Sequence, residues 1–250
     1  MKPTLKILIL VTFTFGAFVH AEDSSDPFSE NSQPDNTPST PDHLIPLNPN
    51  PGNWQRPYVK QLTQYLDLDA VYLARMIVMP SFEAEYSMRV HGDADSYEFD
   101  QSKEYFVSCR ISDKSIWYSM PSNNDEMLQK PVKPQSIKAS LPTATARRIC
   151  AIWQAMILRT QHPEDDGGGL DGVTIEFASQ HGHGETWTPT DGTSPALLWD
   201  LGEKLIEYCK ASDETKNAAL EAINKSADTI EEYLKKPKNP EVAKPSNPSH

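Results

Sequence analysis

Two histidines and a glutamate alternate with glycines in the segment 181–185, the densest cluster of metal-ligand residue types in the sequence. The segment reads His181-Gly182-His183-Gly184-Glu185. In an extended strand the side chains at i, i+2 and i+4 point to one face, so His181, His183 and Glu185 would converge on a single ion. Two nitrogen ligands and one oxygen leave a coordination position open, as water activation by zinc or oxygen chemistry at iron requires. The segment therefore predicts a candidate divalent-metal site.

The same five residues have a second interpretation, the exposed tip of a β-hairpin, where glycine and histidine are tolerated. They also resemble part of the first cupin motif. In that motif the glutamate follows the second histidine at a longer spacing, and a further histidine motif comes later. Here Glu185 lies two residues after His183, and the next histidine is His250. This departure leaves the hairpin tip as the interpretation that competes with a metal site.

The chain has three cysteines, Cys109, Cys150 and Cys209. Three cysteines allow one disulfide within the chain, with three choices of pair. Cys150 and Cys209 fall on the apolar faces of two predicted helices, so we favour a disulfide between them. The alternative is burial as free thiols, which is common for cysteine. No base lies close to any of the three in the sequence, so a nucleophilic thiol is not expected.

Other residue groups have both a chemical and a structural interpretation. Glu83 and Glu85 alternate with apolar residues, and paired carboxylates can divide the roles of acid and base, but on one strand they are more simply surface polarity. Four aromatic residues could line a carbohydrate or peptide groove or belong to the core: Trp117, Tyr118, Trp187 and Trp199. Phosphate-loop, dinucleotide and paired Cys-x-x-Cys motifs are absent from the sequence. The possible metal ion is therefore the single cofactor that the sequence suggests.

The first 21 residues have the pattern of a signal peptide. Lys2 and Lys6 precede an apolar run over residues 7–19, and residues 19–21 end it with the small-x-small pattern that signal peptidase cuts. The run is short for a membrane span, and polar sequence follows it. We therefore expect residues 1–21 to be a signal peptide and the rest to be an exported, soluble protein, periplasmic or extracellular, without a transmembrane segment.

Charge and composition divide the rest of the chain. The net charge is −12, so nucleic acid and anionic membranes would repel the protein. Residues 22–56 are acidic and rich in Pro and Ser, and residues 236–250 are rich in Pro and Lys. Such segments bury too little apolar surface to offset their ordering entropy, so we expect a disordered linker and a disordered tail. Residues 57–235 remain as one globular domain.

Periodicity within 57–235 predicts the secondary structure. Alternation with a period of two predicts strands over 82–90, 105–111, 115–118 and 173–177, and a further strand over 137–141. Apolar stripes and capping residues predict helices over 57–66, 142–159 and 194–208, and a last helix after residue 212. The predicted fold class is α+β, a mostly antiparallel sheet with two to three helices packed on one face.

Two functional hypotheses follow. The first is a non-enzymatic secreted or periplasmic module that binds a protein or an envelope component, because the chain shows an export signal, one domain, flexible tails and no convincing catalytic set. The second is a metal-dependent hydrolase or oxygenase that uses His181, His183 and Glu185. The sequence does not specify an oligomeric state.

Overall fold

The computed structural model describes residues 41–47, 55–93, 99–100, 103–120, 131–162 and 171–236. All of them belong to one compact unit within Pro38–His250. The predicted signal peptide, most of the predicted linker and nearly all of the predicted C-terminal tail lie outside the described residues.

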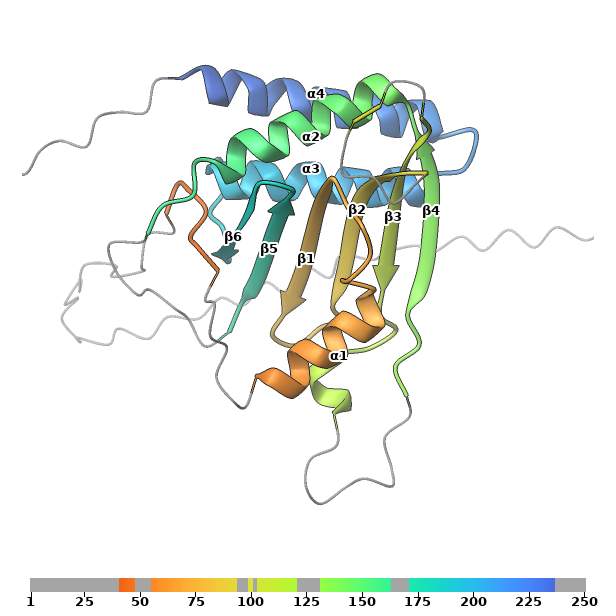
Figure 1. Ribbon diagram of the computed structural model, residues 1–250, viewed down its shortest axis with the longest axis vertical. Coiled ribbons are helices and arrows are strands. Elements are labelled where there is room, and N and C mark those ends of the chain that lie inside the picture. The colour runs from red at the N-terminus through yellow and green to blue at the C-terminus, as the bar shows by residue number, and fades with distance from the viewer. Residues whose placement is uncertain are drawn as a thin grey trace, which may run out of the picture. The chain divides into compact units, whose positions relative to one another are not determined.

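A six-stranded antiparallel sheet forms the centre of this unit (Figure 1), with the strand order β4-β3-β2-β1-β5-β6. The strands are β1 (Ala74–Pro80), β2 (Tyr86–Gly92), β3 (Tyr105–Ile111), β4 (Gln135–Leu141), β5 (Val173–Ser179) and β6 (Gly182–Trp187). The first four strands form a meander. The chain then crosses through a helix, so that β5 pairs with β1 and forms a hairpin with β6. The predicted α+β class is confirmed.

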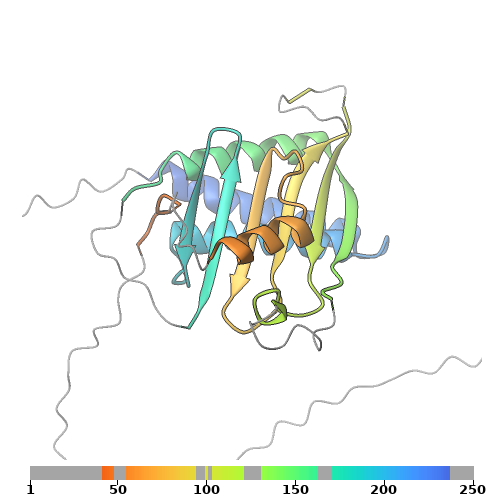
Figure 2. The ribbon, with the colours of Figure 1, turned by 60° about the horizontal axis from the view of Figure 1, so that its bottom comes forward.

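Helices cover both faces of the sheet, but unequally. The helices α2 (Thr143–Ile157), α3 (Ser194–Lys210) and α4 (Lys216–Lys235) lie on one face, as the sequence predicts. Figure 2 shows α1 (Arg56–Leu66) on the opposite face, in front of the sheet. The prediction of two to three helices on one face therefore has to be corrected by this fourth helix. Within the described residues, no helix has the length and apolarity needed to cross a membrane.

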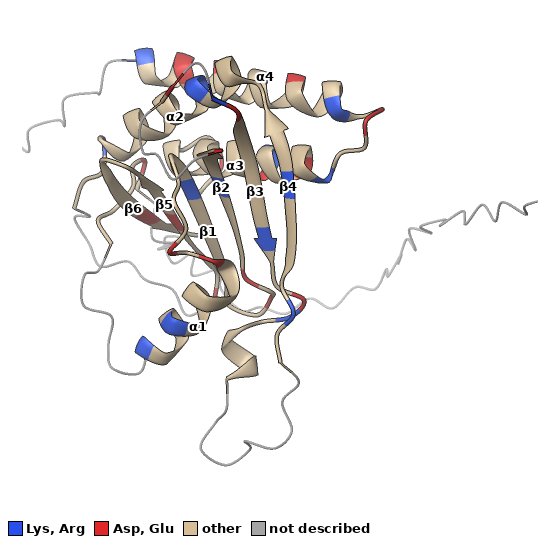
Figure 3. Cartoon of the chain, turned by 45° about the vertical axis from the view of Figure 1, so that its right-hand side comes forward, with Lys and Arg blue, Asp and Glu red and all other residues tan. Residues whose placement is uncertain are grey.

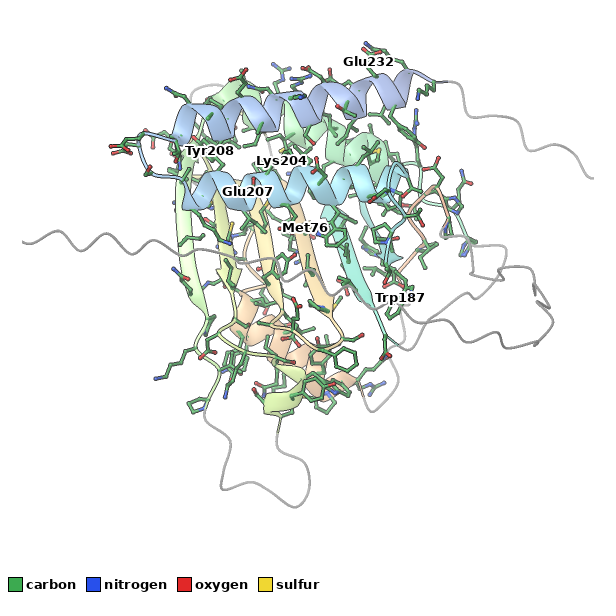
Figure 4. The ribbon with its side chains drawn as sticks, turned by 180° about the vertical axis from the view of Figure 1, so that it is seen from behind. Met76, Trp187, Lys204, Glu207, Tyr208 and Glu232 are labelled. Carbon is green, nitrogen blue, oxygen red and sulfur yellow. The ribbon has the colours of Figure 1, made fainter. Side chains whose placement is uncertain are left out.

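The main core lies between the sheet and α2, α3 and α4. Alternate strand residues such as Met76, Met88 and Phe177 meet the apolar stripes of the helices, which include Trp153. Gly202 lets α3 approach β1 closely, because a Cβ at this position would lie 2.4 Å from the sulfur of Met76. Figure 4 shows Met76 beneath α3.

A smaller core lies under α1. Leu62 and Leu66 of α1 pack against Ile77 of β1, together with Ile116 and Val132 from the segment between β3 and β4. The helix begins with a proline in its first turn, and it ends where Asp67 adopts the left-handed conformation, with φ 56°. This end of α1 lies over the sheet, and it borders the site described below.

The strand predicted over 115–118 is wrong. This segment contains a single 3-10 turn, η1 (Trp117–Ser119). The buried carboxylate of Glu85 accepts hydrogen bonds from the backbone N–H groups of Ile116 (2.6 Å) and Trp117 (3.1 Å), and it thereby fixes the turn. The alternation of apolar and polar residues was too short to reveal this contact.

Residues 41–47 dock on the domain, although they fall inside the predicted linker. Ile45 forms a β-bridge with Glu185 at the outer edge of β6, and Leu44 is buried in the main core. Asp42 accepts a hydrogen bond from the N–H of Ser194 at 2.6 Å, so its carboxylate caps the first turn of α3. The segment covers an edge strand that would otherwise expose its backbone groups.

Candidate functional site

The three predicted metal ligands lie at the β5–β6 hairpin, but the structure does not bring all three together. His181 is exposed in the turn between the strands, whereas His183 and Glu185 lie on β6 itself. Gly182, with φ 152°, separates His181 from the strand, so the alternation that would align the three side chains does not extend to His181. Within the described parts of the chain, no group of three or more His, Cys, Asp or Glu residues is arranged to hold a metal ion.

The two cysteines of the predicted disulfide also occupy different surroundings. All three cysteines are free thiols in the structure. Cys150 of α2 lines a hollow of about 180 Å3 together with Leu73, Gln154 and His181. Cys209 of α3 instead interacts with Cys109 of β3.

Cys150 and His181 do not form a catalytic pair. Burial raises the pKa of the Cys150 thiol to about 12, so the thiol is protonated at neutral pH. A reactive cysteine needs a neighbouring positive charge or base that lowers its pKa. Cys150 is therefore a partly buried side chain whose raised pKa does not suit a nucleophile.

Charged residues divide the α1 side of the sheet into a basic part and an acidic part. Each of β1 to β4 contains one Arg or Lys and no acidic residue, whereas β5 and β6 each contain one Glu and neither Arg nor Lys. Five of them alternate with residues of the main core, so they point away from α2, α3 and α4: Arg75, Arg89, Arg110, Lys138 and Glu176. Glu185 lies directly opposite Glu176 and therefore points to the same side. Figure 3 shows the blue and red segments on these strands.

On β2, β3 and β4 the α1 side of the sheet alternates between basic side chains and hydroxyl groups. The strand register places these side chains in rows across the sheet: Ser87–Arg110–Ser136, Arg89–Ser108–Lys138 and His91–Phe106–Ser140. In the first two rows, every basic residue lies opposite a serine on the neighbouring strand. Cross-strand neighbours have Cβ atoms about 4.5–5.5 Å apart, so one small anion can contact the guanidinium of Arg110 and the hydroxyl of Ser136 together. The hydroxyls of Ser87 and Ser108 are already engaged, with the carbonyl of Leu66 and with His91. We call the six residues of the first two rows the Ser/basic lattice.

A hollow of about 180 Å3 opens over this lattice. The end of α1 forms one wall, with Leu66, Asp67 and Leu68, and the lattice side chains together with Arg75 and His91 form its floor. Asp67 is the single acidic residue among the lining residues, against four basic ones. The hollow is therefore positively charged in a protein whose net charge is −12.

Part of the positive charge holds the end of α1. Arg75 donates to the carbonyl of Leu68 at 2.7 Å, and Arg89 donates to the carbonyl of Asp67 at 3.2 Å and pairs with its carboxylate at 3.1 Å. Cations at a helix C-terminus are favourable because the last carbonyl groups lack partners inside the helix. These two arginines therefore have a structural role.

Arg110 and Lys138 are much less engaged. Within the described residues, the one recorded ion pair of Arg110 is with Asp67 at 3.9 Å, and Lys138 lies over the ring of Phe106, 3.6 Å from its centroid. Both side chains are at least partly exposed. They can therefore contact a ligand without breaking the contacts that hold α1.

His91 borders the lattice in its neutral form. Its Nδ1 lies 2.8 Å from the carbonyl of Gly92, which can only accept, so Nδ1 donates and Nε2 accepts from the hydroxyl of Ser108 at 2.8 Å. Burial lowers the pKa of His91, and the charges of Arg89 and Lys138 lower it further. The positive charge of the site at neutral pH thus comes from arginine and lysine.

The acidic part of the sheet is partly buried. Glu176 of β5 lies opposite Glu185 of β6 and opposite Ile77 of β1. Burial raises the pKa of Glu176, and the charge of Arg75 opposes this effect. Folding therefore stabilises the neutral form of the Glu176 carboxyl relative to its charged form.

We expect Glu176→Gln to stabilise the protein at pH 7. The raised pKa of Glu176 contributes to the free energy of unfolding. This contribution is complete below the unfolded pKa of about 4.3 and is lost as the pH rises through the raised pKa of the folded state. The melting temperature should rise by about 2–4 °C at pH 7, which corresponds to about 1 kcal/mol in a chain of this size. The gain should disappear near pH 4. Thermal melts across this pH range, with the exposed Glu221→Gln as control, test it, and a lower melting temperature at pH 7 would contradict it.

Sequence reasoning missed the Ser/basic lattice, although a signal was present. The pattern Ser-x-basic occurs once on each of three consecutive strands, as Ser87-x-Arg89, Ser108-x-Arg110 and Ser136-x-Lys138. On antiparallel neighbours such a repeat can generate alternating rows, because it runs in opposite directions on adjacent strands. The strand register, which decides whether the rows align, depends on turns and packing and is visible in the structure alone.

Comparisons with known proteins found no match, so the evidence about function comes from the side chains on the sheet. No protein-family model matches the sequence. Neither a curated protein nor a solved structure matches it significantly. The Ser/basic lattice is therefore the feature on which a function can be proposed.

Proposed function

We propose that this chain is an exported, non-enzymatic binding module that captures an anionic group of its ligand on the Ser/basic lattice. The observation that carries the proposal is the register of β2, β3 and β4, which sets arginine and lysine side chains opposite serine hydroxyls over one hollow. Guanidinium and hydroxyl groups are the donors that bind phosphate, sulfate and carboxylate groups.

The local charge supports this proposal because it opposes the charge of the whole protein. An acidic chain needs no basic cluster for solubility, and its other surfaces repel anions. Arg75 and Arg89 lie directly opposite each other, an arrangement of like charges that is unfavourable by itself. The carbonyl groups at the end of α1 offset part of this repulsion, and a bound anion over the lattice would offset more.

The size of the hollow limits what it can hold. Pockets for drug-sized ligands measure about 300–1,000 Å3, and this one measures about 180 Å3. A phosphate, sulfate or carboxylate group fits such a volume, and the remainder of the ligand would lie outside it. We therefore infer that the anionic group belongs to a larger partner, an envelope component or a protein, in line with the predicted export signal.

The surroundings of Ser108 support a role in binding and disfavour a role in catalysis. The Ser108–His91 hydrogen bond has the form of a nucleophile–base pair. However, β3 is paired with β2 on one side and with β4 on the other. The backbone N–H groups around Ser108 are therefore committed to the sheet, and they cannot form the oxyanion hole that acyl transfer uses.

Inorganic phosphate is the first probe of this site. We expect phosphate to shift the backbone amide resonances of β3 and β4 in NMR spectra, and we expect Arg110→Gln and Lys138→Gln each to weaken binding about tenfold, the effect of losing one charge-assisted hydrogen bond. Lys225→Gln on the exposed surface of α4 is the matched control for net charge and should leave the affinity unchanged.

Any one of three results would overturn the proposal. An equal loss of affinity in Lys225→Gln would mean that phosphate responds to net charge and not to the lattice. Labelling by a serine-reactive fluorophosphonate that disappears in Ser108→Ala would make the same sheet face an active site. A titration with phosphate that leaves the β3 and β4 resonances in place would also exclude the lattice as an anion site.

A further inference from the structure

Two cysteines from distant parts of the chain meet where the last turn of α3 packs on β3. Cys109 is buried on the helix side of β3, and Val107 points to the same side two residues earlier. The thiol of Cys209 donates to the carbonyl of Val107 at 3.2 Å. The neighbouring Tyr208, labelled in Figure 4, donates to the carbonyl of Ser140 on β4 at 2.7 Å and fixes this end of α3 on the sheet.

The electrostatic environment agrees with direct contact between the two thiols. The thiol of Cys109 and the charge of Lys216 lower the pKa of Cys209, and the hydrogen bond with Cys209 together with burial raises the pKa of Cys109. A thiol with a lowered pKa is the one that attacks in thiol–disulfide exchange. Burial is the one cause that raises the pKa of Cys150, and among the described residues no neighbouring thiol or charge contributes to this shift.

We infer that Cys109 and Cys209 form the disulfide of this chain, which links the last turn of α3 to β3. This pair takes the place of the Cys150–Cys209 pair that the helix patterns predict. Cys150 then remains a free, partly buried thiol. Disulfides persist in oxidising compartments, so the cross-link would be the resident state of an exported protein.

The chemistry needs an oxidant of the disulfide class, such as glutathione disulfide. The Cys209 thiolate attacks one sulfur of this oxidant, forms a mixed disulfide and releases one thiol. The Cys109 thiolate then attacks the sulfur of Cys209 and releases the second thiol. The protein loses two hydrogen atoms in total, and the oxidant takes up two electrons and two protons as it becomes two thiols.

The cross-link would act directly behind the Ser/basic lattice. Ser108 and Arg110, which flank Cys109 on β3, point to the opposite side of the sheet. A bond from Cys109 to α3 therefore restrains the central strand of the lattice from behind. The cross-link itself does not depend on anion binding, so the two proposals can fail separately.

Peptide mapping without reduction tests the cross-link. The full chain is incubated with glutathione disulfide, denatured, alkylated at its free thiols and digested. We expect one cross-linked peptide pair that contains Cys109 and Cys209, a mass loss of two hydrogen atoms, and alkylation of Cys150 alone. The Cys150→Ser variant should give the same cross-link, and reduction should lower its melting temperature as it lowers that of the parent.

Two outcomes would overturn the inference. A peptide that joins Cys150 to Cys209 would restore the pairing that the sequence predicts. Alkylation of all three cysteines after oxidation would show that the thiols of Cys109 and Cys209 do not reach bonding geometry. Both outcomes are read on the parent chain, so the test does not require that a cysteine variant folds.

Discussion

Glu85→Ala should destabilise the protein by about 3–5 kcal/mol, because one substitution removes the acceptor of four hydrogen bonds around a buried side chain. The side chain of Glu85 has no exposed surface. Its carboxylate accepts hydrogen bonds from Tyr58 of α1 at 2.9 Å, from Ser115 at 3.3 Å and from the backbone of η1. Alanine would leave the buried N–H of Ile116 and the three partly buried donors without this acceptor, and the loss of a buried acceptor costs about 1–3 kcal/mol.

The matched control is two residues away. Glu83→Ala removes the same charge from an exposed position, and the free energy of unfolding should change by no more than about 0.5 kcal/mol. Glu85→Gln should fall between the two variants, because its amide retains one oxygen acceptor. Urea denaturation monitored by circular dichroism measures all three. Similar losses for Glu83→Ala and Glu85→Ala would mean that the carboxylate of Glu85 does not hold α1 and η1 in place.

The contrast between Glu83 and Glu85 shows what a strand pattern cannot reveal. Both residues are in phase with Ser87 and Arg89, so the alternation predicts one wet face for all of them. In the structure α1 docks on this face, and Ser87 donates to the carbonyl of Leu66 at its end. This docking brings Tyr58 of α1 onto Glu85, 27 residues later in the sequence. The local period cannot encode such a contact.

The elements with long, regular patterns were predictable. The stripe of α2, with Ala146, Ile149, Trp153 and Met156, predicts a helix on the core, and all four side chains are buried. The alternation in 105–111 predicts β3 with the bounds that the structure has. Each pattern reflects the apolar face that one element buries against the common core, so it can be recognised within that element alone.

The candidate site and the cysteine contact depend on packing between elements, and they were not predictable to the same extent. Each Ser-x-basic pattern describes one strand, but the lattice requires β3 to pair with β4 across the intervening loop. Similarly, Cys150 and Cys209 both lie on helix faces that meet the core, but the position of α3 over β3 brings Cys109 to Cys209. A pattern tells which face is buried, and the topology decides which faces meet.

The second large effect concerns Trp153, the largest of the fully buried side chains. Its ring packs edge to face on Phe177, with centroids 5.7 Å apart, and its Nε1 donates to the carbonyl of Arg75 at 3.2 Å. Trp153→Ala removes these contacts and opens a cavity between α2 and the sheet. We expect a loss of about 3–5 kcal/mol, the usual range for such truncations in a core. Trp153→Phe keeps most of the apolar volume and should lose less.

Leu158→Ala is the control for this position, because Leu158 follows the last turn of α2 and is 67% exposed. Its effect should stay within about 0.5 kcal/mol. Urea denaturation compares the variants, and a loss below about 1 kcal/mol for Trp153→Ala would contradict the packing described for this core. The cavity would lie on the helix side of the sheet, whereas Arg110 and Lys138 point to the α1 side. At temperatures where it remains folded, Trp153→Phe should therefore bind phosphate as tightly as the parent, because stability depends on one face of the sheet and anion binding on the other.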